Sequence, residues 1–128
     1  MKHVAAALAI KEGRILLTRR APGQQLEGLW EFPGGKQEPT ETIEQCIERE
    51  IREELSLSCT AKHVFTESIY RYEGGAIKLI GVLVELSQEE PELTVHDRFA
   101  WVPLADMLSY ELAPADIPIA KEVINAYG

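Results

Sequence analysis

The sequence has few cysteines, no excess of basic residues and no apolar run of membrane-spanning length. Cys46 and Cys59 are its two cysteines, and their spacing fits neither a zinc site nor a disulfide scaffold. We therefore expect a protein of the reducing cytoplasm. The net charge of −8 argues against a nucleic-acid-binding surface, which needs a basic stripe. We expect neither nucleic acid nor a membrane as a partner.

The chain also lacks internal repeats, linkers and low-complexity segments, so we expect one domain over residues 1–128. Its 45% hydrophobic and 27% charged residues are typical of a globular protein. The negative net charge does not exclude a small polyanionic substrate. Such a substrate can arrive with a metal ion, and local lysines and arginines can act against the overall charge.

Apolar periodicity predicts strands and helices that are interspersed along the chain. A capping box formed by Thr42 and Gln45 predicts a helix that ends near Leu55, and a last helix is expected from about residue 117 to Tyr127. The segment Pro33-Gly34-Gly35 is expected to stop an extended piece. This order predicts an α/β fold with helices on both faces of a mixed sheet. The expected strands are Val4–Ile10, Ile15–Thr18, Leu29–Phe32, His63–Tyr72, Ala76–Leu86 and Phe99–Val102, with a helical turn at Leu104–Leu108.

The first predicted helix carries carboxylates on its apolar stripe. At about 100° per residue, Glu50 and Glu54 fall within roughly 20° of Ile43, and Glu53 lies at the edge of the stripe. Glutamate is almost never buried without a partner, and carboxylates three or four residues apart repel one another in a helix. These glutamates therefore predict a bound cation. Oxygen ligands of this kind suit Mg²⁺ or Mn²⁺.

Residues 35–57 read GKQEPTETIEQCIEREIREELSL. This stretch resembles the Nudix box, G-x5-E-x7-R-E-U-x-E-E-x-G-U, where U is aliphatic, and it departs from the box only at Ser56. The glycine of the box would end the helix in a left-handed conformation, so serine is expected to cost about 1 kcal/mol without touching the chemistry. Segments 28–36 and 112–118 resemble the MutT-type branch, which hydrolyses nucleoside triphosphates. The resemblance implies the Nudix fold, an α/β/α sandwich around a mixed β-sheet.

The resemblance also implies roles for the residues of the box. Glu50 and Glu53 both remain candidates for the general base, because carboxylates that share a metal have coupled titrations. Of the two, Glu50 is favoured. Arg49 is expected to orient Glu50 and to neutralise the cluster. Glu41 is expected to hold the preceding loop. The implied metal ligands are the Gly35 carbonyl and the side chains of Glu50, Glu53 and Glu54.

Basic residues that flank the box are candidates for binding the phosphates. Arg19 and Lys36 are expected to contact them, because the chain between these residues and Gly35 is short. Arg20 has two equally weighted interpretations, a phosphate contact or a solvated surface charge.

The base pocket is expected to involve Trp30, Phe32 and Asp116. Alternation along the extended piece suggests that one of the two aromatic residues lines the pocket and the other belongs to the core. Asp116 lies where MutT-type proteins read the base edge, and an aspartate there would accept from an exocyclic amino group. It is also a good N-cap for the last helix, and the two roles are compatible.

Many Nudix relatives carry a glutamate just before the pair His96-Asp97, and this glutamate completes the metal site. Val95 occupies that position here. Either Asp97 or His96 substitutes for the missing ligand, or the site binds one metal fewer.

These features predict metal-dependent hydrolysis of a nucleoside triphosphate to a nucleoside monophosphate and pyrophosphate, by attack of water on the β-phosphorus. Two biological settings fit: removal of oxidised purine dNTPs such as 8-oxo-dGTP, which protects DNA, or action on cytidine-type nucleotides. The ending Leu112–Asp116 is closer to proteins resembling CTP pyrophosphohydrolase. The alternatives are a Nudix hydrolase of nucleotide sugars or ADP-ribose, and a catalytically silent nucleotide sensor. Monomer and homodimer both remain open.

Overall fold

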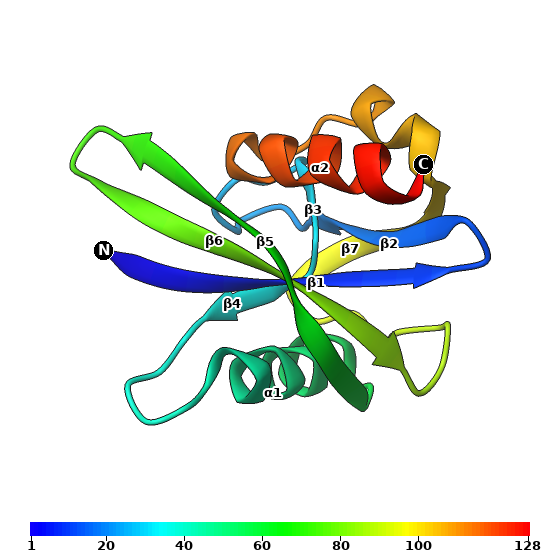
Figure 1. Ribbon diagram of the computed structural model, residues 1–128, viewed down its shortest axis with the longest axis horizontal. Helices are drawn as coiled ribbons and strands as arrows, with labels where there is room; N and C mark the ends of the chain where they lie inside the picture. The colour runs from blue at the N-terminus through cyan, green and yellow to red at the C-terminus, as the bar shows by residue number, and fades with distance from the viewer.

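A long strand, β1, lies in the middle of a mixed sheet in the computed structural model, which describes all 128 residues (Figure 1). It pairs in parallel with β6 and antiparallel with β4 and β2. Strand β6 pairs with β5 at the edge of the sheet, and β2 also pairs with β3 and β7. The strands are β1 (Lys2–Lys11), β2 (Arg14–Arg20), β3 (Trp30–Glu31), β4 (Gly34–Lys36), β5 (Cys59–Tyr72), β6 (Gly75–Leu86) and β7 (His96–Pro103).

One long helix covers each face of the sheet (Figure 1). Helix α1 (Ile43–Leu55) packs on one face and α2 (Ile117–Tyr127) on the other, which confirms the predicted α/β/α sandwich. Two short 3₁₀ helices, η1 (Leu104–Ser109) and η2 (Pro114–Asp116), precede α2. None of the helices has both the length and the apolar character needed to cross a membrane.

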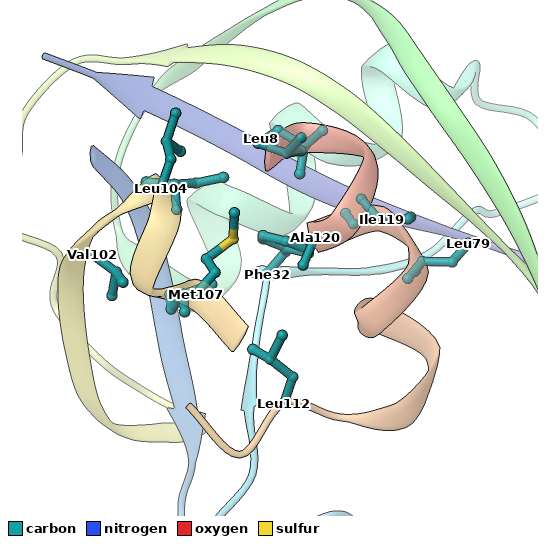
Figure 2. Packing of buried hydrophobic residues seen from close by; sticks show 13 residues of the cluster. Leu8, Phe32, Leu79, Val102, Leu104, Met107, Leu112, Ile119 and Ala120 are labelled. Atoms are coloured by element: carbon teal, nitrogen blue, oxygen red, sulfur yellow. The ribbon is translucent and has the colours of Figure 1, made fainter. Parts of the chain in front are cut away.

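The buried side chains form two clusters, one beneath each helix. In β1, Ala5 and Ala7 face the cluster beneath α1, whereas Ala6 and Leu8 face the cluster beneath α2. This alternation explains why β1 is apolar at nearly every position, because a strand covered on both faces needs no polar side. Figure 2 shows the second cluster, in which Leu8, Phe32 and Met107 pack together with residues of α2.

Both ends of α1 follow the prediction. The Thr42 hydroxyl accepts from the Gln45 backbone N–H, and the Gln45 side chain accepts from the Thr42 backbone N–H, so the capping box is complete. Ser56 ends the helix in the left-handed conformation with φ 55°, where the Nudix box has glycine. The serine therefore adopts the glycine conformation rather than changing the end of the helix.

The segment after Phe32 differs from its prediction. Instead of stopping the extended chain, Gly34–Lys36 pairs with β1, and the Ala7 N–H donates to the Pro33 carbonyl at 2.8 Å. The pairing brings the backbones so close that a Cβ at Gly34 would overlap the Ala5 carbonyl. Glycine here permits close strand pairing rather than a turn. The local sequence is compatible with both.

Two strands start three or four residues earlier than predicted. Strand β5 begins at Cys59 rather than His63, and β7 begins at His96 rather than Phe99. In both cases the additional residues are held by pairing with a neighbouring strand, which is a long-range contact.

Candidate active site

A cavity of about 1590 Å³ opens beside the N-terminal half of β1 and runs from α1 to the start of α2. One end holds the box carboxylates Glu50, Glu53 and Glu54. The other end is closed by Phe32 and Asp116. The structure thus brings residues that lie more than sixty positions apart in the sequence into one cavity.

Arg49 organises the acidic end of the cavity. Its Nη1 donates to Glu50 Oε1 at 2.8 Å and to Glu53 Oε1 at 2.9 Å. Its Nε and Nη2 form a two-point contact with Glu41, at 3.0 and 2.7 Å. The hydrogen bond from Arg49 lowers the Glu41 pKa to about 2, so Glu41 is a permanent anion at neutral pH. This arrangement agrees with the expected orienting role of Arg49.

Glu41 also contacts the loop that precedes α1. Its Oε1 accepts from the Glu38 backbone N–H at 2.9 Å, and its carbonyl accepts from the Gln37 side-chain amide at 2.8 Å. The Arg49 Nη2 adds a bond to the Lys36 carbonyl at 3.0 Å. Glu41 and Arg49 therefore fasten the loop between β4 and α1 to the helix.

Glu54 is a partly buried carboxylate of the box. Its Oε1 accepts from the Gly34 N–H at 3.1 Å. Burial raises the Glu54 pKa to about 8, and the neighbouring charges of Glu31 and Glu50 contribute in the same direction. The acidic end therefore holds more carboxylates than its own cations balance.

The residues at this end fit a hard divalent cation. The donors are oxygen atoms, which suit Mg²⁺ or Mn²⁺, and a cation would stabilise the ionised form of Glu54, whose pKa is raised first by burial and then by repulsion from Glu31 and Glu50. Gly35 leaves room for the cluster, because a Cβ there would collide with the Glu50 carboxylate. The Gly35 carbonyl has a weak contact with Cys46 Sγ at 3.5 Å and keeps acceptor capacity.

The carboxylates are not yet gathered around one point. No three histidine, cysteine or acidic side chains are arranged to hold a metal ion as they stand. Arg49 holds Glu50 and Glu53, while Glu54 faces the Gly34 N–H. For all three carboxylates to ligate one ion, their side chains would have to leave these partners.

Asp116 lies at the far end of the cavity, where its side chain is buried. Its Oδ2 accepts from the Phe32 N–H at 2.9 Å. Burial raises the Asp116 pKa to about 8, and the charge of Glu31 adds to this shift. Asp116 occupies the predicted N-cap position of α2, but its side chain makes no capping hydrogen bond with the helix. Its backbone is helical because η2 leads directly into α2.

The two aromatic residues of the predicted base pocket lie in different places. Phe32 lines the cavity, whereas Trp30 lies outside it and packs edge-on against Tyr110, with ring centroids 5.0 Å apart. Strand alternation would put residues 30 and 32 on the same face, so the separation arises because β3 ends at Glu31 and Phe32 lies beyond it. Sequence reasoning missed Tyr70 and Tyr72, which line the cavity from the β5–β6 hairpin.

Glu31 is the carboxylate that sequence reasoning missed. Its Oε2 lies 2.9 Å from His96 Nε2 and 3.3 Å from Arg20 Nε, and its charge raises the pKa values of both Glu54 and Asp116. It therefore lies between the two ends of the cavity. The sequence did contain a signal for Glu31. A carboxylate between the apolar residues Trp30 and Phe32 is unusual in the same way as the glutamates on the apolar stripe of α1.

The neighbouring arginines Arg19 and Arg20 have different environments. Arg19 donates to both oxygens of Asp97, at 2.9 and 2.8 Å, and does not line the main cavity. Arg20 does line it, and its Nε is buried without a well-aligned hydrogen-bond acceptor. The prediction that Arg19 contacts phosphate conflicts with this geometry, because β2 directs the Arg19 side chain toward β7. Lys36 lines the cavity, and its contact with phosphate stays a prediction.

Neither suggested substitute for the ligand missing at Val95 reaches the cavity. Asp97 is occupied by Arg19, and His96 is buried against Glu31. Neither residue lines the cavity. Glu31 is the additional carboxylate that the fold brings there.

Asp116→Asn is expected to change how stability depends on pH. In the folded chain the Asp116 pKa is about 8, against an ordinary value of 3.8, so between these values the folded state holds a proton that the unfolded state has lost. The stabilisation from this group is complete below pH 4, falls by up to about 1.4 kcal/mol per pH unit and is lost above pH 8. Urea unfolding between pH 5 and pH 8 should show a smaller loss of stability for the variant than for the wild type. The exposed Asp106→Asn variant is the control, and identical losses in all three proteins would contradict the prediction.

Comparison with known proteins extends these observations. A protein-family model described as NUDIX domain matches residues 5–122. CTP pyrophosphohydrolase of Escherichia coli K12 is 36% identical over 121 residues, which cover 94% of this chain and 90% of that protein. An 8-oxo-dGTP diphosphatase of the same organism is 31% identical over 126 residues, covering 96% of this chain and 98% of that protein.

Solved structures show the same architecture. The solution structure of the E. coli ORF135 protein matches with a TM-score of 0.87 and 34% identity, over 98% of this chain and 89% of that one. A MutT NUDIX hydrolase from Burkholderia pseudomallei matches with a TM-score of 0.83 and 25% identity, over 95% and 97% of the two chains.

Proposed function

This chain belongs to the Nudix family, as a hydrolase of phosphoric anhydride bonds, and we propose that it converts a nucleoside triphosphate into a nucleoside monophosphate and pyrophosphate. The observation that carries the proposal is the shared cavity, which has the box carboxylates at one end and Asp116 at the other. A nucleoside triphosphate would use both ends, with its phosphates beside the box carboxylates and its base beside Asp116. The similarity to CTP pyrophosphohydrolase and to 8-oxo-dGTP diphosphatase supports this substrate class.

The acidic end supplies the hydrolytic chemistry. A divalent ion there, Mg²⁺ or Mn²⁺, would neutralise phosphate charge and lower the pKa of the attacking water. Glu53, Glu54 and the Gly35 carbonyl are its proposed ligands, together with Glu50 as a ligand or as the general base. As the base, Glu50 takes a proton from water while the water oxygen bonds to the β-phosphorus. The bond between the β-phosphorus and the oxygen that bridges the α- and β-phosphates breaks. The nucleoside monophosphate leaves with that oxygen, and pyrophosphate is the other product.

Glu50 and Glu53 differ in position, which supports Glu50 as the base. The Glu50 carboxylate packs against Gly35 and is largely enclosed, whereas the Glu53 side chain is 55% exposed. Arg49 contacts both, so it orients whichever carboxylate accepts the proton.

The phosphates are proposed to contact Arg20 and Lys36, two of the basic side chains that line the cavity together with the carboxylates. The Arg20 Nε is buried beside Glu31 Oε2 at 3.3 Å, but the guanidinium has further N–H groups, which can donate to a phosphate oxygen in the cavity. Arg20 therefore takes the role that the sequence suggested for Arg19.

At the other end, Asp116 and Glu31 are proposed to read the base. With its pKa of about 8, the Asp116 carboxyl is largely protonated at neutral pH and can donate, whereas the Glu31 carboxylate oxygens accept. Such a pair suits a base edge with one acceptor and one amino donor, as cytosine and adenine have, and the similarity to CTP pyrophosphohydrolase favours cytosine. This arrangement favours cytidine-type nucleotides over 8-oxo-dGTP.

A pyrophosphate-release screen across canonical and modified NTPs and dNTPs, with Mg²⁺ and with Mn²⁺, tests the proposal. We expect release from triphosphates, with the highest kcat/KM for a cytidine-type nucleotide. The same screen includes nucleotide sugars and ADP-ribose, with the released monophosphate as readout. Activity confined to those compounds would contradict the proposal. Nucleotide binding without turnover under either metal would instead support a sensor.

A further inference from the structure

The outer edge of β5 is protected along only part of its length. Strand β5 ends the sheet, with β6 as its one neighbour. Near its start, the Ala61 N–H donates to the Glu48 carboxylate of α1 at 2.9 Å, and the pairing with β6 is irregular up to Thr66. From Thr66 to Tyr72 the register is regular, and no hydrogen bond or ion pair covers the outer side. Unprotected edges of this kind are where sheets pair with other chains.

The backbone groups that point outward from this segment can be assigned from the hairpin. A two-residue turn at residues 73–74 joins the closing pair Tyr72 and Gly75. The closing pair of such a hairpin is hydrogen-bonded, and bonded pairs then alternate along the ladder. Tyr70 therefore bonds to β6, whereas the N–H and C=O groups of residues 67, 69 and 71 point away from the sheet.

The side chains of the same three residues are self-complementary. Glu67, Ile69 and Arg71 lie on one face of β5 and are all exposed, with Ile69 48% exposed. A two-fold axis through Ile69 would place Ile69 opposite its own copy and Glu67 opposite Arg71. Opposite charges facing each other across neighbouring strands stabilise the pairing. The residues that offer free backbone groups are therefore also the residues whose side chains match under this symmetry.

We propose that β5 pairs antiparallel with β5 of a second copy of this chain, about a two-fold axis at Ile69, to form one continuous sheet. The interface has Ile69 at its centre and two Glu67–Arg71 ion pairs around it. Glu67 already lies 3.5 Å from Lys78 on β6, so its carboxylate would be shared by two cations. An isologous contact of this kind closes at two copies, because each β5 edge is then fully used.

The surrounding elements leave room for this pairing. The backbone of β5 is hydrogen-bonded to α1 at Ala61, eight residues or about 26 Å along a strand from Ile69. Helix α2 packs on β5 at Phe65, whose ring centroid lies 5.4 Å from that of Tyr127. An antiparallel arrangement places the two α1 helices at opposite ends of the shared sheet. Figure 1 shows the β5–β6 hairpin projecting beyond the ends of both helices. The pairing would also brace Tyr70 and Tyr72, which line the cavity.

Sedimentation equilibrium from micromolar to millimolar protein tests the proposal with a charge exchange. The wild type should approach twice the 14.3 kDa protomer mass as its concentration rises. Arg71→Glu and Glu67→Arg, each alone, put like charges opposite each other at two symmetric positions. Each should raise the dimer dissociation constant about tenfold or more. The double variant Glu67→Arg/Arg71→Glu restores opposite charges and should bring the constant back to within about threefold of the wild type.

Two further variants separate this interface from other causes. Lys121→Glu makes the same change in net charge as Arg71→Glu at an exposed position of α2, and it should leave the dissociation constant unchanged. Ile69→Lys places two positive charges on the axis and should abolish the dimer, with circular dichroism confirming the fold. A monomer at every concentration, a dimer insensitive to both single reversals, or a double variant that does not recover would each overturn the proposal.

Discussion

Glu53→Gln should lower kcat about a thousandfold, with little change in thermal stability. The substitution keeps the shape of the side chain but removes the charge that the proposed site needs for a divalent cation. A loss of this size corresponds to about 4 kcal/mol of transition-state stabilisation, within the range for a preorganised charge in an active site. Because the Glu53 side chain is 55% exposed and has Arg49 as its partner, the fold does not depend on it. Pyrophosphate release at saturating nucleotide measures kcat, and a thermal melt measures stability.

Glu44→Gln is the matched control on the same helix. Glu44 is exposed in the first turn of α1 and lies outside the cavity, so kcat should stay within about twofold of the wild type. Full activity of Glu53→Gln would show that the metal-site assignment is incorrect. A metal titration followed by calorimetry should also show weaker Mn²⁺ binding to Glu53→Gln, which separates loss of the ion from loss of the base.

Arg20→Met should reduce kcat/KM for the triphosphate substrate by about 10- to 100-fold. The variant keeps much of the apolar stem but removes a charged donor from the cavity wall, and such hydrogen bonds contribute about 1.5–3 kcal/mol. We expect the loss mainly in KM, because the arginine is proposed to bind phosphate before and during the reaction. Steady-state kinetics with the best substrate of the screen measures both constants.

Arg19→Met is the control for this prediction. Arg19 precedes Arg20 in the chain, but its guanidinium is held by Asp97 outside the cavity. Its substitution should leave KM within about threefold of the wild type. A larger effect at Arg19 than at Arg20 would favour the sequence-based assignment and contradict the structural one.

Sequence reasoning was sufficient where the interacting residues lie close together in the chain. The helix with its misplaced glutamates, its capping box and its left-handed end follows from periodicity and local hydrogen bonding, and all three features are present. They depend on residues only a few positions apart. The same holds for β1, whose continuous apolar character correctly predicted cover on both faces.

The incorrect predictions concern contacts between distant segments. Asp116 occupies the N-cap position as predicted, but its carboxylate bonds to the Phe32 N–H, eighty-four residues away, instead of capping the helix. Gly34 resembled part of a turn, but it allows a close pairing with β1. In each case several local geometries were compatible with the residue, and a long-range partner selected one.

The sequence by itself determined the chemistry at the acidic end of the cavity, because one helix and the loop before it carry Gly35, Arg49 and the box glutamates at fixed spacing. Only the tertiary structure decided what lies opposite them. Glu31, Arg20 and Asp116 come from three separate elements and meet because β2, β3 and the start of α2 converge on one cavity. The physical reason is that side-chain direction in a helix follows from spacing, whereas the facing of separate elements follows from how the sheet packs.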